Sequence, residues 1–373
     1  MRILIDAQPL LEPLAGIGRY AKSLLTAFSE RELEDEFYLF YGASMRPWRV
    51  ELPEFSNPAF NSRIIRFPGK VYRLLTEKLK ILPPSSFIGR CGLYHGLNYY
   101  VPAGDYPKIV NIYDMSFRLY PRYFTPDRLK DIGRKASLSA VRADKIITGS
   151  MSAKEDIVEL LKVPAEKVRV IPNGVEKKFR VLSRQEREEF RRKLGLPEKF
   201  ILFVGTVEPR KNLTALVRAY HRLGLRDTRL VIAGGRGWLY DELFEELRRL
   251  NMGDRVVFTG YIPDEDLPGI YSCASVFAYP SVYEGFGFPP LEAMACGVPV
   301  ITGDRSSLPE IVGDAGICVD PENVEALAGA VSGVLNDSRL SREMSARGIE
   351  RAAGYTWEKC ADETYKLYRE LAR

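Results

Sequence analysis

The sequence predicts an α/β protein with two doubly wound units, each built on a parallel sheet. At 373 residues the chain is long for one hydrophobic core and suits two domains of ordinary size. Runs rich in β-branched and aromatic residues alternate with helical patterns through both halves, which is typical of parallel sheets with helical crossovers. After Asn173-Gly174 a turn and then a charged helical segment follow, so we expect the halves to meet near residues 175–182.

Strand signals occur throughout both halves of the chain. In the first half they are Arg2–Asp6, Phe37–Tyr41, Arg63–Phe67, Leu93–His95, Lys108–Ile112, Asp144–Thr148 and Val168–Ile171. In the second half they are Phe200–Gly205, Arg229–Ala233, Val256–Thr259, Ser275–Tyr279, Pro299–Thr302 and Gly316–Val319. Ligands of open parallel sheets bind outside the carboxyl ends of the strands, so residues that follow these runs are candidates for a site.

Two carboxylates, Glu284 and Glu292, stand on either side of a glycine-rich helix start. Pro289-Pro290 open the helix, where a missing N–H costs nothing, so Glu284 is predicted on a loop and Glu292 on the helix. The N–H groups of a helix start favour an anion, and a diphosphate suits this position. The alternative is a solvated loop acid followed by a helix-capping acid.

A basic pair, Arg210 and Lys211, follows the strand that ends at Gly205 and precedes a helix with apolar residues at helical spacing. A guanidinium and an ammonium here stabilise the negative charge that grows on a departing diphosphate. The alternative is a solvated pair on the protein surface.

The motifs of the chain resemble, in their order, those of the retaining glycosyltransferases of family 4. The matching stretches are Met1 to Asp6, Gly16 to Tyr20, Asp114 to Phe117, Pro172 to Val175, Gly205-Thr206, Arg210 to Asn212, Tyr283 to Met294, and Ser306 to Glu310. The resemblance implies the GT-B fold, in which two Rossmann-like domains face an interdomain cleft. It places an acceptor-side domain at 1–175, a nucleotide-sugar domain at 176–356, and a last helix within 357–373 that packs back on the first domain.

The resemblance also implies roles for individual residues. The donor-binding set it implies is Gly16, Gly18, Gly205, Thr206, Arg210, Lys211, Glu284, Gly285, Phe286, Gly287, Leu291 and Glu292. Within this set, Arg210 and Lys211 bind the diphosphate, Glu284 accepts hydrogen bonds from the donor sugar, and Glu292 holds the ribose hydroxyls. The catalytic residues are Arg210, Lys211, Glu284 and Asp114. No essential metal or other cofactor is implied.

The chain departs from the family at Tyr113, where many members have histidine before the aspartate. A tyrosine with its usual pKa near 10 is a poor base at neutral pH. We assign Tyr113, Asp114 and His95 to the acceptor side, and a structural role for His95 is the alternative. Front-face attack, in which the departing diphosphate takes the acceptor proton, needs no protein base and tolerates this substitution.

Two other motifs have simpler explanations. Gly16-Ile17-Gly18 resembles a truncated dinucleotide fingerprint, but no acidic residue ends the second predicted strand, so we interpret it as the family's flexible glycine loop. Asp264-Glu265-Asp266 is a formal D-x-D metal motif, and an N-cap with first-turn acids before a helix explains it better.

Charge is unevenly distributed along the chain. Residues 1–175 carry 26 Lys/Arg against 19 Asp/Glu, and the rest carry 28 against 30. The densest basic stretch, 58–90, is interleaved with aromatic and aliphatic residues, which indicates either a surface for anionic membrane lipid or a solvated basic helix. No nucleic-acid-binding module accompanies the charge. Scattered cysteines, with no secretory signal or membrane span, predict a cytoplasmic protein, with the inner face of the cell membrane as its peripheral contact.

These features together predict a retaining, metal-independent transferase. It would move a hexose, mannose from GDP-mannose by resemblance, to a saccharide or lipid-linked acceptor in polysaccharide or glycolipid biosynthesis. The alternatives are a GT-B nucleotide-sugar epimerase, a phosphorylase, and a non-catalytic nucleotide-sugar-binding protein.

Overall fold

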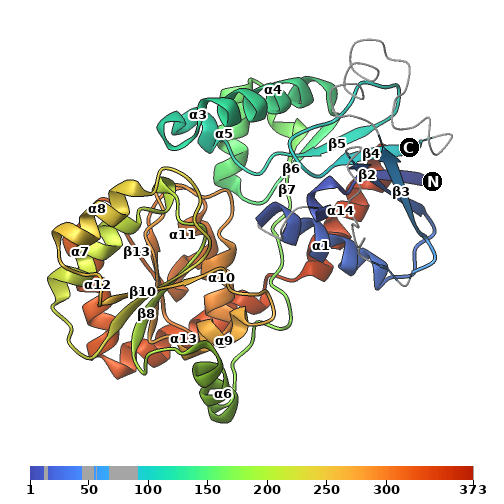
Figure 1. Ribbon diagram of the computed structural model, residues 1–373. Coiled ribbons are helices and arrows are strands. Elements are labelled where there is room, and N and C mark those ends of the chain that lie inside the picture. Colours follow the sequence, from blue (N-terminus) through green and yellow to red (C-terminus); the bar gives the residue numbers. More distant parts are fainter. Residues whose placement is uncertain (12–15, 44–53, 56, 67–90, 373) are drawn as a thin grey trace. The chain divides into compact units, whose positions relative to one another are not determined.

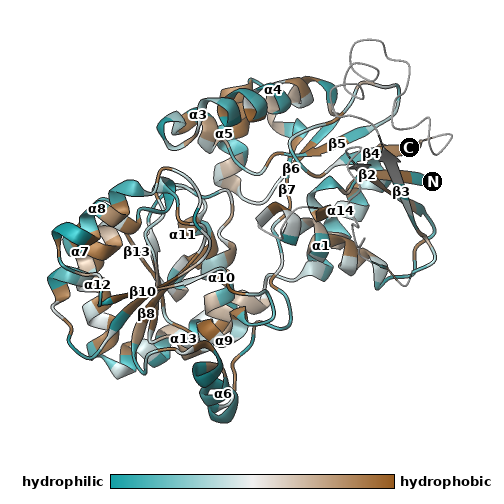
Figure 2. Cartoon of the chain, in the orientation of Figure 1, coloured by the Kyte–Doolittle hydropathy of each residue, from teal (hydrophilic) through white to brown (hydrophobic). Residues whose placement is uncertain are grey.

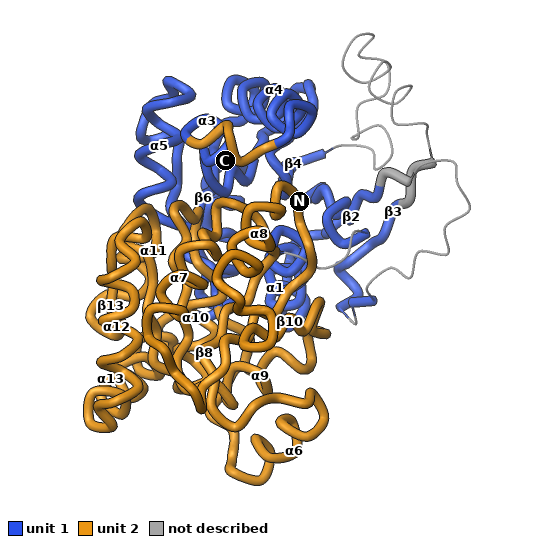
Figure 3. Tube along the Cα trace, turned by 60° about the vertical axis from the view of Figure 1, so that its left-hand side comes forward, with its two compact units in different colours: residues 1–119, 125–174, 356–373 blue, residues 120–124, 175–355 orange. Residues whose placement is uncertain are grey.

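The computed structural model describes residues 1–372 apart from 12–15, 44–53, 56 and 67–90 (Figure 1). The chain divides into two compact units (Figure 3). Unit 1 comprises residues 1–119, 125–174 and 356–373, and unit 2 comprises residues 120–124 and 175–355. Residues 120–124 belong to unit 2 although they lie inside the first half of the sequence, an assignment that the sequence did not indicate. The cleft between the domains stays a prediction.

In the described part of unit 1, seven parallel strands form one sheet in the order β3-β2-β1-β4-β5-β6-β7. They are β1 (Arg2–Asp6), β2 (Glu36–Ala43), β3 (Phe60–Arg66), β4 (Leu93–Gly96), β5 (Lys108–Asn111), β6 (Lys145–Thr148) and β7 (Val168–Val170). The predicted strands of this half are confirmed. Burial on both faces explains the apolar centres of β1 (Ile3 to Ile5) and β5 (Ile109 and Val110).

Helices cover both faces of this sheet (Figure 1). They are α1 (Gly16–Ser29) and α14 (Trp357–Leu371), which pack on each other, together with α3 (Ser116–Leu119), α4 (Pro126–Arg142) and α5 (Met151–Leu161). Short 3₁₀ turns are η1 (Gln8–Leu11), η4 (Pro121–Tyr123, in unit 2) and η5 (Ala165–Lys167). Gly16 and Gly18 lie in the first turn of α1, and residues 12–15 before them lie outside the described residues, so the flexible glycine loop stays a prediction.

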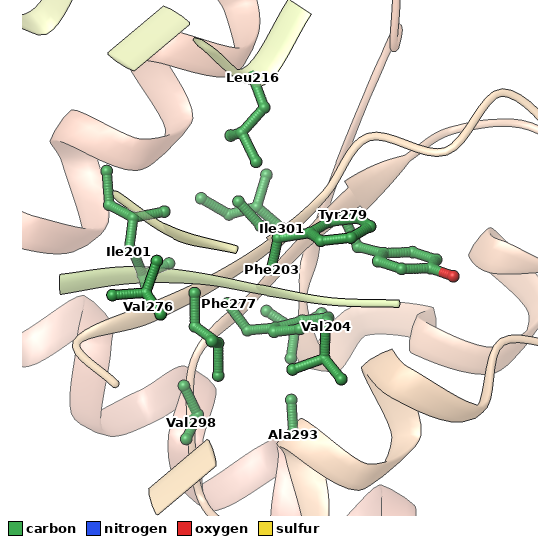
Figure 4. Packing of buried hydrophobic residues seen from close by; sticks show 14 of the residues in the cluster. Ile201, Phe203, Val204, Leu216, Val276, Phe277, Tyr279, Ala293, Val298 and Ile301 are labelled. Atoms are coloured by element: carbon green, nitrogen blue, oxygen red, sulfur yellow. The ribbon is translucent and has the colours of Figure 1, made fainter. Parts of the chain in front are cut away.

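Unit 2 has six parallel strands among its described residues, in the order β10-β9-β8-β11-β12-β13. They are β8 (Phe200–Val204), β9 (Arg229–Ala233), β10 (Val256–Gly260), β11 (Val276–Tyr279), β12 (Val300–Gly303) and β13 (Ile317–Val319). These also confirm the prediction. Figure 4 shows the core where Phe203, Phe277 and Ile301 of adjacent strands pack between helix residues Leu216 and Ala293.

The helices of unit 2 again lie on both faces of the sheet (Figure 1). They are α6 (Arg184–Leu194), α7 (Leu213–Leu223), α8 (Asp241–Arg249), α9 (Leu267–Cys273), α10 (Phe288–Ala295), α11 (Leu308–Val312), α12 (Val324–Asn336) and α13 (Ser338–Ala353), with η6 (Pro209–Lys211) and η7 (Gly313–Ala315). Most show one apolar and one polar face, and α6 is mostly polar, with Phe190 and Leu194 packed against the core (Figure 2). A capping box between Ser183 and Glu186 stabilises the start of α6.

Among the described residues, no helix is long and apolar enough to cross a membrane. Most of the basic stretch 58–90 lies outside the described residues. Its described part forms β3, in which Arg63 lies over the ring of Tyr38 at 5.8 Å from the centroid.

Candidate functional site

The candidate site lies in unit 2, where the chain leaves three adjacent strands. Because β8, β11 and β12 are neighbours in the parallel sheet, the segments that follow them leave at the same edge. The segment after β8 carries Arg210 and Lys211, the segment after β11 carries Glu284, and the segment after β12 carries Ser306 and Ser307.

Glu284 is the centre of a buried polar network. The residue is 8% exposed. Oε1 accepts hydrogen bonds from Lys211 Nζ (2.5 Å), Tyr279 OH (3.0 Å) and Ser281 Oγ (2.6 Å), and Oε2 lies 2.9 Å from Arg210 Nη1. These contacts exclude the alternatives in which Glu284 is a solvated loop acid and Arg210 and Lys211 are a solvated surface pair. A buried charge needs charged or hydrogen-bonding partners, and all three side chains have them here.

The ionisation of this network follows from its burial and its charges. Burial alone would raise the pKa of Glu284, but the positive charges of Arg210 and Lys211 lower it to about 2. Burial and the nearby Arg210 lower the pKa of Lys211, against the opposing effect of Glu284. Burial and the Glu284 charge raise the pKa of Tyr279 well above its usual value, so this hydroxyl stays protonated and donates.

Arg210 is held by oxygen atoms from two segments. Nη2 donates to Glu208 Oε1 (2.7 Å), and Nη1 donates to the carbonyl of Tyr283 (2.5 Å). The backbone of Arg210 is fixed as well, because its carbonyl accepts a hydrogen bond from the Val282 N–H (2.9 Å) and lies 3.1 Å from Ser281 Oγ. The guanidinium therefore has a defined position before any ligand binds, and preorganised charge of this kind is what stabilises a developing anion.

Two serines after β12 hold the loop that contains Glu284. Ser306, with φ of 57°, accepts a hydrogen bond at Oγ from the Glu284 N–H (2.8 Å). The buried Ser307 hydroxyl faces the carbonyls of Glu284 (2.9 Å) and Phe286 (2.6 Å). In a trans peptide the N–H points opposite to the carbonyl, so the N–H groups of Gly285 and Gly287 are directed away from Ser307.

The helix that follows carries the second carboxylate, as predicted. Gly287 precedes α10 with φ of 117°, a conformation that strongly favours glycine. Glu292 lies on α10, is 2% exposed, and accepts a hydrogen bond from Tyr271 OH (2.9 Å). Leu291 is fully buried in the core of unit 2, so its side chain supports the helix.

Gly205 and Thr206 follow β8 at the same edge of the sheet. The carbonyl of Gly205 approaches Gly234, the residue after β9, so closely that a Cβ at Gly234 would lie 1.9 Å from it. Thr206 is exposed. This contact keeps the turns after β8 and β9 together.

The predicted acceptor-side residues lie in unit 1. The Tyr113 hydroxyl donates to the carbonyl of Leu97 (2.6 Å), and burial raises its pKa well above the usual value, so it is not a base in this structure. Asp114 Oδ1 accepts hydrogen bonds from the N–H (2.9 Å) and Oγ (2.6 Å) of Ser116, at the start of α3.

His95 has the structural role that was the alternative. It is completely buried, with Nε2 donating to Asn111 Oδ1 and Nδ1 accepting from Tyr368 OH, both at 2.6 Å. Burial lowers its pKa to about 4, so the ring is neutral at pH 7. The acceptor-side assignment of His95 is corrected, because neither ring nitrogen reaches the surface.

The acidic triplet before α9 is explained by ion pairs rather than by capping. Asp266 is the N-cap residue but makes no capping hydrogen bond, and it pairs with Lys193 (2.5 Å). Asp264 pairs with Lys178. The described residues contain no group of three or more His, Cys, Asp or Glu side chains placed to hold a metal ion.

Several residues of the site were missed in the sequence. Tyr279, Ser281 and Glu208 hold Glu284 and Arg210, and no motif marks them. Their positions carry a weak signal, because Tyr279 ends a predicted strand and Glu208 precedes the basic pair by two residues. Ser306-Ser307 was recognised as part of a motif without a role.

Comparison with known proteins identifies the class to which this site belongs. Models described as Glycosyltransferase Family 4 and Glycosyl transferases group 1 match residues 14–179 and 186–351. The sucrose-phosphate synthase of Thermosynechococcus elongatus superposes with a TM-score of 0.79 at 23% identity, over 99% of this chain and 98% of that one. Anabaena HepE in complex with UDP-glucose gives 0.77 at 17% identity, with both chains fully covered. The chain belongs to the family 4 (group 1) glycosyltransferases and has their GT-B architecture of two parallel-sheet domains.

One curated relative has a higher sequence identity to this chain than the two solved structures above. The O-antigen chain mannosyltransferase B of Escherichia coli is 33% identical, with 100% of both chains covered. This chain is thus a glycosyltransferase whose homologues include a mannosyltransferase.

Proposed function

We propose that the protein transfers mannose from GDP-mannose, with retention of configuration, to a saccharide or lipid-linked acceptor. The observation that carries the proposal is the buried network in which Arg210 and Lys211 flank Glu284. The name of the Escherichia coli relative supports mannose as the sugar and a polysaccharide chain as the acceptor.

The network suits this reaction electrostatically. As the bond between the anomeric carbon and the diphosphate oxygen breaks, negative charge grows on the diphosphate, and Arg210 and Lys211 stabilise it without a metal. The acceptor oxygen then forms a bond on the same face of the sugar, and its proton passes to the departing diphosphate. Glu284, ionised at neutral pH, accepts hydrogen bonds from sugar hydroxyls.

A melting-temperature panel with GDP, UDP, ADP and their sugar conjugates tests the donor, because a ligand that binds only the folded state raises the melting temperature. We expect GDP and GDP-mannose to give the largest shifts. A larger shift with another nucleotide would show that the donor carries that nucleotide and not GDP. No shift with any nucleotide would favour the alternative of a non-catalytic binding protein, which Tyr113 motivates.

Transfer assays on variants test the site itself. We expect Lys211→Ala and Glu284→Ala to lose transfer by about 10²–10³-fold or more, with Glu284→Gln as the isosteric variant. Lys199→Ala and Glu325→Ala, at side chains 61% and 73% exposed, are matched controls and should behave like the wild type. Normal rates in the folded site variants would refute the assignment. Product anomeric configuration, read by NMR, tests retention.

Peripheral contact at the cytoplasmic face of the membrane, through residues 58–90, is a further part of the proposal. The basic and apolar composition of this stretch supports it. We expect co-sedimentation with vesicles that contain anionic lipid and not with neutral vesicles. Equal recovery with both would refute this contact.

A further inference from the structure

A pocket of about 140 Å³ lies beside the candidate donor site within unit 2. Its apolar floor is formed by the buried side chains of Val207, Leu213 and Leu243, from the segment after β8 and from the starts of α7 and α8. Tyr123 and Tyr240 also line it. Apart from Glu208, which holds Arg210, none of its lining residues has a role in the donor site described above.

The wall at Tyr123 is held in place by aromatic contacts. Trp238 Nε1 donates to the Tyr123 carbonyl (2.6 Å), and the ring of Trp238 lies 6.3 Å from that of Phe124. Tyr120 stacks on Tyr123 with ring planes 9° apart. The segment 120–124, which Figure 3 shows in the colour of unit 2, is thus fixed where it lines the pocket.

The lining contains two carboxylates. Glu208 is 6% exposed and keeps its charge paired with Arg210, while Glu242 lies exposed at the mouth. No Lys or Arg side chain is among the lining residues that the structure describes. Two carboxylates disfavour a phosphate here, whereas sugar hydroxyls donate well to carboxylates and sugar C–H groups pack on aromatic faces.

We propose that this pocket binds one residue of a neutral saccharide, and that the occupant belongs to the acceptor chain. The assignment to the acceptor rests on the proposed function. The volume is below the roughly 300–1,000 Å³ of sites for drug-sized ligands, which suits a single sugar ring of a longer chain.

Two sets of contacts connect the pocket to the candidate donor site. In the first, Glu208 pairs with Arg210, which pairs in turn with Glu284. In the second, Tyr123 stacks on Tyr120, whose ring centroid lies 5.6 Å from that of Tyr283, the neighbour of Glu284. A sugar in the pocket would therefore lie beside Glu208, and Glu208 pairs directly with Arg210 of the network around Glu284.

Backbone strain at the mouth of the pocket supports a ligand-binding role. Leu239 has φ of 53° and its side chain is 52% exposed. A left-handed conformation is strained for a non-glycine residue, and such strain is concentrated at ligand sites. Here it brings a bulky apolar side chain to the mouth of the pocket.

Saturation-transfer NMR and calorimetry on the full chain test the pocket, with α-linked mannotriose, maltotriose and mannose 6-phosphate as probes. We expect a neutral trisaccharide to bind, and Tyr240→Ala and Glu242→Gln each to weaken that binding about tenfold. Tyr261→Ala and Glu245→Gln, at exposed residues outside the pocket, are the matched controls. The pocket assignment is overturned if neither trisaccharide binds, if mannose 6-phosphate binds best, or if folded Tyr240→Ala and Glu242→Gln bind like the wild type.

The same variants separate this inference from the proposed function. Neither Tyr240 nor Glu242 is in the donor network, so both variants should keep the wild-type melting shift with GDP. A wild type that responds to GDP but binds no saccharide would refute the pocket alone. Saccharide binding without any nucleotide response would support the pocket and refute the donor site.

Discussion

The imidazole of His95, enclosed between Asn111 and Tyr368, makes the stability of unit 1 depend on pH. Its pKa is lowered from 6.5 to about 4 by burial, so the folded state binds this proton less readily than the unfolded state. The stabilisation from neutral His95 is complete above pH 6.5. It is lost as pH falls from 6.5 towards 4, by at most about 1.4 kcal/mol per pH unit.

We expect urea denaturation of His95→Gln between pH 7 and 4.5 to show a smaller loss of stability than the wild type over the same range. The comparison of slopes is needed because Asp6, whose pKa burial raises to about 6, titrates in this range with the opposite effect. Parallel slopes for the two proteins would show that His95 does not carry this dependence.

Two roles were open for His95 from the sequence alone, and only long-range contacts decide between them. Its partner Tyr368 is 273 residues away in the chain, on the last helix. Tyr113 is a similar case, because its hydroxyl faces the carbonyl of Leu97 and no local pattern predicts that orientation. Arg210, Lys211 and Glu284 were identified from motifs, but their burial and mutual pairing required the fold.

At the scale of elements, the turns after β8 and β9 depend on a glycine. A Cβ at Gly234 would lie 1.9 Å from the Gly205 carbonyl, and φ at Gly234 is 151°, whereas a Cβ at Gly235 would meet nothing within 4 Å. We expect Gly234→Ala to lower the melting temperature strongly or prevent folding, and Gly235→Ala to leave it nearly unchanged. Similar melting temperatures for the two variants would contradict this packing.

The loop before α10 depends on the Ser307 hydroxyl. Ser307→Ala leaves the carbonyls of Glu284 and Phe286 without this donor, so we expect a loss of roughly 1–3 kcal/mol in unfolding free energy. Nucleotide affinity should fall too, because the peptides of Gly285 and Gly287 lose their fixed orientation. The exposed Ser338→Ala is the control, with a change within about 0.5 kcal/mol. Unchanged stability and affinity in Ser307→Ala would argue against this role.

The strands were predictable because many have buried apolar centres between polar or turn residues, as β1, β8 and β9 show. Element ends were less predictable. Asp266 precedes α9 without capping it, because Lys193 competes for its carboxylate. Lys193 and Asp266 are 73 residues apart in the sequence, so a local sequence pattern cannot predict that they pair.

At the scale of the whole molecule, the site assignment predicts where a nucleotide slows hydrogen exchange. With the nucleotide that gives the largest melting shift, we expect protection in Gly205–Asn212 and Tyr283–Glu292, the segments that carry the donor network. The Lys211→Ala variant should lose this protection at the same nucleotide concentration. Protection confined to other segments would place the nucleotide elsewhere.

The division of the chain into units has a consequence for synthesis on the ribosome. Every residue of unit 2 precedes residue 356, whereas unit 1 includes residues 356–373. Until α14 is made, His95 lacks the hydroxyl of Tyr368, and α1 lacks the helix against which it packs. The half of the protein that is translated first is therefore the half that finishes folding last, and chaperones would meet its uncovered α1 face while unit 2 is already complete.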